Sequence, residues 1–458
     1  MNAAGAVAAS SFRGWWPLIP LGLIALASLG VLAGRDASWL QEPILFAGLS
    51  LLMGACCLLA YGWIRSRPID RHGLNWILAI GVALQVVACG LYQSDDVNRY
   101  LVEGRQILAG QNPYAIPPAD PRAAILVPPQ VAAEVNHPQM TAIYPPVTLA
   151  AQAAVAAVSP ALPGHAAKAG FRIAGVLGSL AVIALALALL LRLGQPPALI
   201  VIVAWNPVLA IFGSGESHND LIMCVLLLLA LHAAASVRHR LAAGLTALAC
   251  LAKPFAVVAL LPVLHAGRWR GWWLVLLLPV LAYLPFAAAG SGLVASFLTF
   301  GGDRHFHGVL DPGLRWLLRA FVEPAWVEQA VRVVLGLLLV AGLGLVWRWS
   351  ATPPGSPILV EKVAWSLALL LICLPTLHPW YFLVLVALLP FTHSWALAVW
   401  TASAGIYWLH GIRMAQVGGW TETPWVTVLA HWPAMLLLAS EARHCRGSTT
   451  CSASVSHG

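Results

Sequence analysis

The chain has 458 residues, of which 60% are hydrophobic and only 9% are charged, and its formal net charge is +8. A soluble domain carries about 25% charged residues, so this composition excludes an ordinary soluble protein and indicates a polytopic integral membrane protein. The positive charge does not indicate a nucleic-acid-binding protein, because the basic residues lie in short clusters between apolar runs, as in cytoplasmic loops.

Long apolar runs along the chain are candidate membrane-spanning helices. In chain order they are residues 15–33, 44–64, 74–92, 144–158, 170–191, 198–213, 219–236, 241–264, 271–289, 327–347, 360–377, 379–392, 394–410 and 424–440. Several are shorter than the roughly 20 residues that a perpendicular helix needs, so some are expected to be broken or re-entrant. The sequence therefore predicts an all-α polytopic membrane protein with about 11 to 14 transmembrane helices.

Arginine clusters set the predicted orientation in the membrane. Arg65, Arg67 and Arg71 follow the second apolar run, and cytoplasmic loops are enriched in such residues. Placing this cluster inside puts the polar segment 94–144 and a second loop, 290–326, on the outer side of the membrane. We therefore expect an integral membrane protein with two long loops outside the cytoplasm.

The domain organisation is predicted to be simple. Residues 1–440 contain no evident repeat or separate soluble domain and are expected to form one transmembrane domain. Residues 441–458 are polar and rich in Ser and Thr, which predicts a disordered cytoplasmic tail. Within the run 241–264, Lys253 precedes Pro254, and proline removes a backbone donor, so this run is predicted to break into two half-helices.

The first outer loop contains an unusual concentration of acids. Residues 94–144 hold five of the seventeen acidic residues, including the adjacent pair Asp95 and Asp96. Apolar residues in 96–109 predict a helix lying along the membrane surface, with the two acids at its N-terminus. A capping role explains one carboxylate but not both. Because carboxylates at a membrane boundary are costly, we expect Asp95 or Asp96 to act as a general base towards a sugar hydroxyl.

Polar and aromatic residues follow these acids through the rest of the loop. Tyrosines and amides near carboxylates suit sugar binding, although the accompanying prolines are equally consistent with a rigid loop alone. The candidate substrate-binding residues in this segment are Arg99, Tyr100, Asn112, Tyr114, His137 and Tyr144.

A second polar corner joins the runs 198–213 and 219–236. One or two polar residues would suffice for a turn here, yet Glu216, His218, Asn219 and Asp220 occur together. The simpler interpretation is a turn in which Asn219 or Asp220 caps the next helix. The alternative, which we favour, is that these four residues contribute to the substrate site.

Cationic groups on the same face form the last candidate set. Lys253 lies within an apolar run, where an ammonium needs a partner, and the others are Arg304, His305 and His378. Such groups could hold a phosphate, while an ordinary solvated loop or a helix cap would explain the last three without substrate. The spacing of His218 with His305 or His307 does not support a divalent metal, so no metal or other cofactor is predicted.

Taken together, these motifs resemble the GT-C superfamily of glycosyltransferases, and in particular the bacterial polyprenol-phosphate-mannose-dependent α-mannosyltransferases. The likeness is scattered over about residues 90–385. It is carried by Asp95-Asp96, Arg99-Tyr100, Gly104-Arg105, Asn112-Pro113-Tyr114, Ile143-Tyr144-Pro145-Pro146, Asn206-Pro207, His218-Asn219-Asp220, Leu251-Ala252-Lys253 and His378-Pro379-Trp380-Tyr381. The acids are adjacent here rather than separated by one residue, so the resemblance leaves open which one acts.

The resemblance implies a GT-C-like helical bundle whose long first extracytoplasmic loop is catalytic. It implies transfer of a hexose, here mannose, from a polyprenyl-phosphate donor to a lipid or glycan acceptor, with inversion and an aspartate as base. Arg304, Lys253 or a histidine would stabilise the leaving polyprenyl phosphate. The expected partners are this donor, its acceptor and membrane lipids, with no nucleic acid.

Two other functions remain open at this point. A transporter or lipid flippase shares the apolar content and broken helices, but it would place paired repeats and charges at mid-membrane. A lipid-glycan ligase or polymerase would use several outer-loop arginines, and the available ones are Arg99, Arg105, Arg122, Arg304, Arg315 and Arg319.

Overall fold

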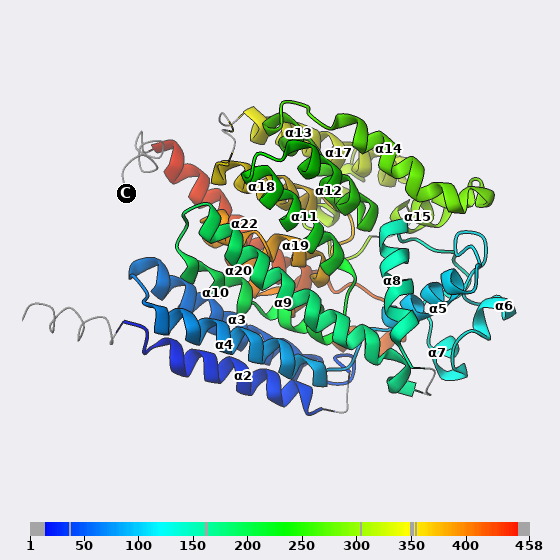
Figure 1. Ribbon diagram of the computed structural model, residues 1–458, viewed down its shortest axis with the longest axis horizontal. Helices are drawn as coiled ribbons and strands as arrows, with labels where there is room; N and C mark the ends of the chain where they lie inside the picture. The colour runs from blue at the N-terminus through cyan, green and yellow to red at the C-terminus, as the bar shows by residue number, and fades with distance from the viewer. Residues whose placement is uncertain are drawn as a thin grey trace, which may run out of the picture.

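The computed structural model describes residues 14–35, 38–160, 164–302, 305–348, 352 and 355–447. Regular structure in these residues is helical, and the only pairing of extended backbone among them is a set of isolated bridges from Phe306 and His307 to Thr376 (Figure 1). The prediction of an all-α polytopic membrane protein is thereby confirmed.

Helical segments coincide with the predicted apolar runs. Five of those in the described part of the chain are long and apolar enough to cross a membrane, namely Pro43–Ser66, Arg71–Gly90, Ala166–Arg192, Trp272–Ala289 and Pro324–Arg348. Five shorter apolar helices are Leu18–Ala33, Pro146–Val158, Asp220–Ala235, His239–Ala252 and Pro254–Ala266. The total of about 11 to 14 crossings stays a prediction.

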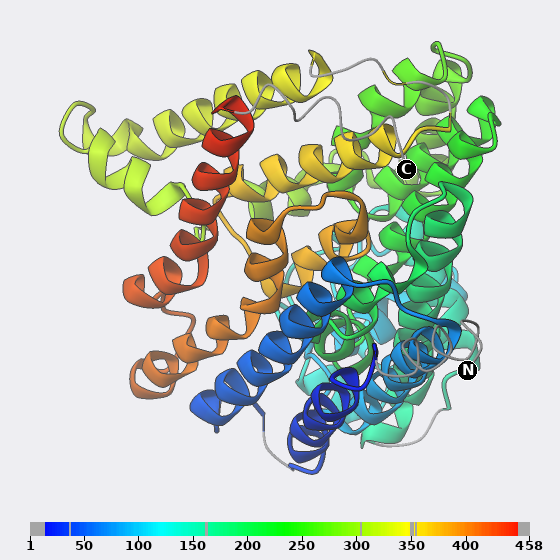
Figure 2. The same ribbon diagram turned by 90° about the vertical axis from the view of Figure 1, so that its left-hand side faces the viewer.

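The N-terminal helices pack side by side and also contact the C-terminal ones. Helix α2 (Leu18–Ala33) packs against α3 (Pro43–Ser66) and α4 (Arg71–Val87), and Asp70 caps α4 by accepting a hydrogen bond from the Gly73 amide at 2.9 Å. Helix α3 also contacts α20 (Trp395–Ala402), so the blue and orange segments lie together (Figure 2). The two halves of the chain therefore form one bundle.

Two helices break in the middle of their apolar runs. The short helices η3 (Pro197–Ile200) and α10 (Val201–Ala204) are followed by η4 (Leu209–Gly215), with a bend of 65° between the two parts. Helix α12 (His239–Ala252) ends before Lys253, whose backbone is extended, and the chain continues through η5 (Pro254–Ala256) into α13 (Val257–Ala266). The predicted break at Lys253-Pro254 is confirmed.

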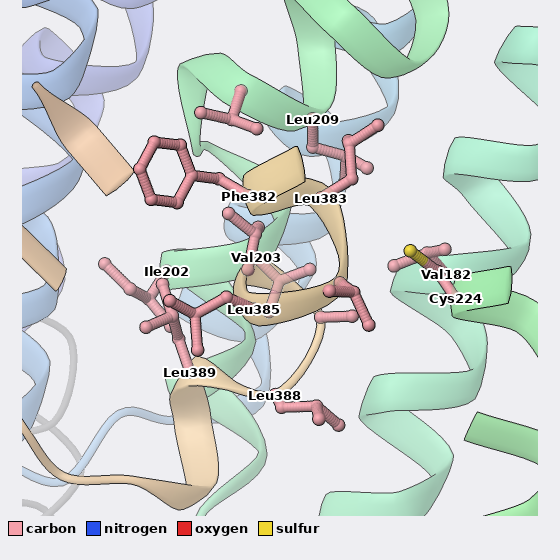
Figure 3. Close-up of a cluster of buried hydrophobic side chains, with 14 of the residues drawn as sticks. Val182, Ile202, Val203, Leu209, Cys224, Phe382, Leu383, Leu385, Leu388 and Leu389 are labelled. Atoms are coloured by element: carbon pink, nitrogen blue, oxygen red, sulfur yellow. The ribbon is translucent and has the colours of Figure 1, made fainter. Parts of the chain in front are cut away.

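An irregular buried segment fills the centre of the bundle. It consists of η7 (Pro379–Phe382), α19 (Leu383–Val386) and η8 (Leu389–Phe391). Leu383, Leu385 and Leu388 of this segment are fully buried, and they lie among side chains of α9 (Ala169–Arg192), α10 and α11 (Asp220–Ala235) (Figure 3). This packing fixes the position of Trp380 within η7 and of His378 just before it.

The remaining helices complete the bundle and the outer loops. They are α14 (Trp272–Tyr283), η6 (Leu284–Ala289), α15 (Gly292–Gly302), α16 (Asp311–Leu318), α17 (Pro324–Arg348), α18 (Pro357–Cys373), η9 (Ala404–Leu409), α21 (His410–Val417) and α22 (Pro424–Gly447). Glu441 of α22 accepts hydrogen bonds from the amides of Trp395 and Ala396 at 2.8 and 3.1 Å. The chain is therefore still helical where the disordered tail 441–458 was expected to begin, and residues 448–458 lie outside the described part.

The acid-rich loop folds into a compact unit at one end of the molecule (Figure 1). It contains α5 (Asp96–Leu108), α6 (Pro121–Ala124) and α7 (Pro129–Ala133), and it leads into α8 (Pro146–Val158). The α5 helix was expected, and protein covers most of it, so that even Glu103 and Gln106 are fully buried. Gly104 allows this close packing, since a Cβ there would lie 2.6 Å from the carbonyl oxygen of Gln152 in α8. The position of α5 along the membrane surface stays a prediction.

Candidate functional site

Asp96 lies at the centre of a polar group at the start of α5. Its Oδ1 accepts a hydrogen bond from Asn136 Nδ2 at 2.6 Å, and its Oδ2 accepts one from the Tyr100 hydroxyl at 3.3 Å. His218 Nδ1 lies 3.5 Å from the same Oδ2. Burial, followed by the neighbouring charge of Asp95, raises the pKa of Asp96 to about 6. A carboxylate with this pKa is a stronger base than an exposed aspartate and is still largely ionised at neutral pH.

The structure places the two adjacent acids in different surroundings. Asp95 precedes the first residue of α5, is exposed, and makes no capping hydrogen bond through its side chain. In the described part of the chain, its side chain accepts one hydrogen bond, from the Ser94 hydroxyl to Oδ1 at 3.4 Å. Capping therefore does not account for Asp95, and of the two carboxylates it is Asp96 that faces the other candidate site residues.

The corner between η4 and α11 brings His218 to Asp96. Ser217 adopts a left-handed φ of 62°, which turns the chain sharply before His218. His218 Nε2 lies 2.9 Å from Glu216 Oε2, so the ring stands between two carboxyl groups. Burial lowers the pKa of His218 well below its usual value, and it raises the pKa of Glu216, so we expect a neutral imidazole. Asn219 precedes α11 without making a side-chain cap.

Aromatic rings from the C-terminal half pack over His218. The indole of Trp380 is stacked on it with ring centroids 4.2 Å apart, and His378 is stacked on the other side of Trp380 at 4.4 Å. His378 Nδ1 lies 2.9 Å from the Tyr407 hydroxyl. This stack holds His218 in place by shape rather than by hydrogen bonding alone.

Lys253 and Asp220 form an ion pair beside this group. The ammonium of Lys253 contacts Asp220 Oδ1 and lies 4.3 Å from the centroid of the Tyr381 ring. The Asp220 side chain is 2% exposed, whereas that of Lys253 is 17% exposed. The helix break at Lys253 allows this contact, because the backbone there is extended and the side chain reaches the start of α11. Of the two side chains, that of Lys253 is therefore the more accessible to a ligand.

Arg99 is occupied within the protein. Its Nε donates to Glu103 Oε1 at 2.8 Å, and its terminal nitrogens donate to the carbonyl oxygens of Asn136, His137, Met140 and Thr141 at 2.8–3.3 Å. All five contacts are internal, so the geometry gives Arg99 the role of positioning the segment that carries Asn136. Its prediction as a substrate-binding residue is not tested by these contacts.

The other predicted loop residues also have partners within the protein, either in the loop or in η6. Asn112 donates to the carbonyl oxygen of Phe286 at 3.1 Å, and the Tyr114 hydroxyl donates to that of Tyr144 at 2.7 Å. The Tyr144 ring packs edge-on against Tyr100, with centroids 5.4 Å apart, and is therefore next to the ring that contacts Asp96. His137 is exposed and has a left-handed φ of 45°.

The cations of the second outer loop are not brought to Asp96 by any contact in the described residues. Arg304 lies outside those residues. His305 Nδ1 lies 2.9 Å from Asp311 Oδ1, and its other ring nitrogen contacts Glu328. Arg315 contacts the same two acids, which makes this a separate ion cluster between α16 and α17.

Several residues around Asp96 were not among the predicted site residues. Asn136 and Trp380 stand next to the predicted His137 and His378 in the sequence, so the motifs were found but these two residues were not chosen from them. Tyr407 carries no sequence signal, because it lies in an apolar segment. In the described residues, no group of three or more His, Cys, Asp or Glu side chains is arranged to hold a metal ion.

Comparison with known proteins identifies a family for this chain. Residues 3–267 match the family model described as "Alpha-(1->6)-mannopyranosyltransferase, N-terminal domain", which is more than half of the chain. The matched region contains Asp96, His218 and Lys253, while Trp380 and His378 lie beyond it. Neither a curated protein nor a solved structure matches the chain.

Proposed function

This chain belongs to the alpha-(1->6)-mannopyranosyltransferase family and is therefore a membrane glycosyltransferase, and from that premise we propose that it moves mannose from a polyprenyl-phosphate donor to a lipid or glycan acceptor. Transfer takes place on the outer face of the bacterial inner membrane, within one transmembrane domain of residues 1–440. The observation that carries this proposal is the partly buried Asp96, held by Asn136 and Tyr100 with its pKa raised to about 6.

The proposed reaction is a direct displacement at the anomeric carbon. A hydroxyl oxygen of the acceptor forms the new bond to that carbon while the bond to the phosphate oxygen breaks, and the leaving polyprenyl phosphate keeps the electron pair. Asp96 takes the hydroxyl proton as general base. One displacement inverts the configuration, so a β-linked donor gives an α-linked product.

Asp96, His218 and Glu216 lie in a row, and a proton can move between them. If Nε2–H of His218 donates to Glu216, then its Nδ1 can accept the proton that Asp96 has taken up. If Glu216 is protonated instead, His218 donates from Nδ1 to an ionised Asp96. Both arrangements are consistent with the distances of 2.9 and 3.5 Å, and both orient the Asp96 carboxylate.

Lys253 is the residue that we assign to the leaving phosphate. It is already paired with Asp220, so its charge is held near the site before the donor arrives. A preorganised cation stabilises the negative charge that develops on the leaving oxygen. A donor attached to a membrane lipid also suits a site outside the cytoplasm, where nucleotide sugars are absent.

The test is transfer by the purified protein in liposomes. Radiolabelled polyprenyl-phosphate mannose is offered with a crude lipid extract, and wild type is compared with Asp96→Asn and Asp95→Asn. We expect a labelled product from wild type and Asp95→Asn and almost none from Asp96→Asn. A folded, fully active Asp96→Asn protein would remove this acid from the mechanism. Absence of transfer from any polyprenyl-monophosphate sugar would overturn the donor assignment and favour a ligase or a transporter.

A further inference from the structure

A second group of polar side chains surrounds the start of α5, away from His218 and Lys253. Asn98 Nδ2 donates to the carbonyl oxygen of Glu134 at 3.3 Å and lies 3.5 Å from Glu134 Oε2. Lys168 Nζ lies 4.0 Å from the same carboxylate oxygen. Asp95 lies three residues before Asn98, on the same side of the helix, and its carbonyl oxygen accepts a hydrogen bond from the Asn98 amide at 3.0 Å. We call Asp95, Asn98, Glu134 and Lys168 the Glu134 group.

Asn98 of the Glu134 group and the proposed base Asp96 lie on different faces of α5. Residues two apart on an α-helix point about 200° away from each other, so Asn98 and Asp96 face in nearly opposite directions. The chain from Glu134 to Asn136 crosses between them, because Glu134 contacts Asn98 while Asn136 donates to Asp96. An extended ligand with one end at Asp96 therefore needs to pass over only residues 134–136 to reach the Glu134 side chain.

The Glu134 group has hydrogen-bonding capacity that the described protein leaves unused. The Lys168 side chain is 3% exposed, and in the described residues its ammonium has this single loose contact and no hydrogen bond. Asn98 is 1% exposed, and its Oδ1 has no hydrogen-bond partner in the described part of the chain. Burying such groups without partners is unfavourable, so a ligand that pairs with them gains affinity.

The chemistry of the Glu134 group indicates what that ligand is. Glu134 is 55% exposed and Asp95 is exposed, so both carboxylates can accept hydrogen bonds from outside, while Lys168 can only donate. A hydroxyl group both donates and accepts, so neighbouring hydroxyls of a sugar can satisfy all of these groups together. The group contains two carboxylates and one ammonium, so its net negative charge disfavours a phosphate. A neutral glycan is compatible with this charge.

We propose that the Glu134 group is a subsite for the neutral glycan of the acceptor, binding the sugar that precedes the one whose hydroxyl is deprotonated by Asp96. The inference rests on the proposed function, since it assigns one substrate of that reaction. It makes the acceptor a chain of at least two sugars rather than a lone lipid hydroxyl.

Steady-state kinetics test the subsite. We expect Glu134→Gln and Lys168→Met to raise KM for the acceptor glycan about tenfold, as the loss of one charge-assisted hydrogen bond implies, with KM for polyprenyl-phosphate mannose unchanged. Asp120→Asn is the matched control, because Asp120 lies in the same loop and its carboxylate pairs, within the described residues, with the exposed Arg122 alone. An unchanged acceptor KM in both variants, or an equal rise in donor KM, would overturn the subsite.

Binding without the donor separates the two proposals. A fluorescently labelled mannose oligosaccharide is titrated into wild type, Glu134→Gln and Asp120→Asn in nanodiscs. We expect about tenfold weaker binding for Glu134→Gln alone. This result in a protein that transfers no mannose from polyprenyl phosphate would support the subsite and refute the donor. Active transfer together with glycan binding that is insensitive to Glu134→Gln would refute the subsite and leave the donor standing.

Discussion

The His218 imidazole and the Trp380 indole are stacked with their ring planes only 12° apart, which joins the two halves of the chain at the candidate site. His218 lies within the region that matches the family model, whereas Trp380 lies beyond it. The N-terminal half therefore supplies the acids and the lysine, and the C-terminal half supplies the ring that fixes the imidazole next to Asp96. A truncated N-terminal half would lack this support.

Replacing the proposed base should abolish most of the activity. We expect Asp96→Asn to lower the rate of mannose transfer by about 10²–10⁴-fold, the usual contribution of a general base, because the amide cannot take the hydroxyl proton. Asn136 and Tyr100 can still hydrogen-bond to an amide, so folding should be retained. Transfer rate and thermal unfolding in detergent are measured together. An inactive but unfolded variant would carry no information on catalysis, so Asp96→Glu serves as a second variant with a carboxylate.

The pH dependence should identify Asp96 independently. Because its pKa is raised to about 6, the transfer rate should fall as the pH decreases through about 6, where the base becomes protonated. The negative charge of Asp95 contributes to this rise, so Asp95→Asn should move the acid limb to lower pH while keeping the rate at neutral pH when the acceptor is saturating. The check is the initial rate from about pH 4.5 to 8. An acid limb that stays in place in Asp95→Asn would contradict the assignment.

The fold was largely predictable from the sequence because its signals are local. Runs of apolar residues must form helices in a membrane, where backbone groups have no water to bond. The break at Lys253 was equally local, since Pro254 cannot continue the hydrogen-bonding pattern. The burial of α5 was not predictable, because the sequence shows its apolar face but not that α8 and the rest of the loop cover its polar face.

The candidate site was predictable by residue type but not by arrangement. The acids, His218 and Lys253 stand out because polar groups are costly in an apolar chain. The approach of His218 to Asp96 joins residues more than a hundred positions apart, and no sequence spacing encodes such a contact. For the same reason the sequence did not show that the Arg99 side chain is used up by four carbonyl oxygens and Glu103.

Arg99 should be needed for the shape of the site rather than for binding substrate. We expect Arg99→Lys to lower the thermal stability and the rate together, because one ammonium cannot replace the bonds to Glu103 and to residues 136–141. Loss of these bonds frees Asn136 and so disorders Asp96. Thermal unfolding and both KM values are compared with those of Arg122→Lys, an exposed arginine of the same loop. A stable Arg99→Lys protein with only a raised donor KM would restore the substrate-binding role.

Variants of Lys253 should distinguish a role in protein stability from a role in donor binding. Removing one partner of a buried ion pair leaves the other charge unpaired, at a cost of about 3–5 kcal/mol, so Lys253→Met should lower the thermal stability markedly. In the double variant Lys253→Met/Asp220→Asn neither charge remains, and we expect most of that stability to return. The donor KM should nevertheless stay high in the double variant, because no cation is left for the phosphate.

The comparison of these two variants decides what Lys253 does. Thermal unfolding in detergent and the KM values for polyprenyl-phosphate mannose and acceptor are measured for wild type, the single variant and the double variant. If Lys253 holds the phosphate, the acceptor KM is unchanged in the double variant while the donor KM is raised about tenfold or more, as expected for the loss of a charge-assisted contact. If its only role is to neutralise Asp220, the double variant recovers both its stability and its donor KM, and the leaving phosphate must then be held by another group.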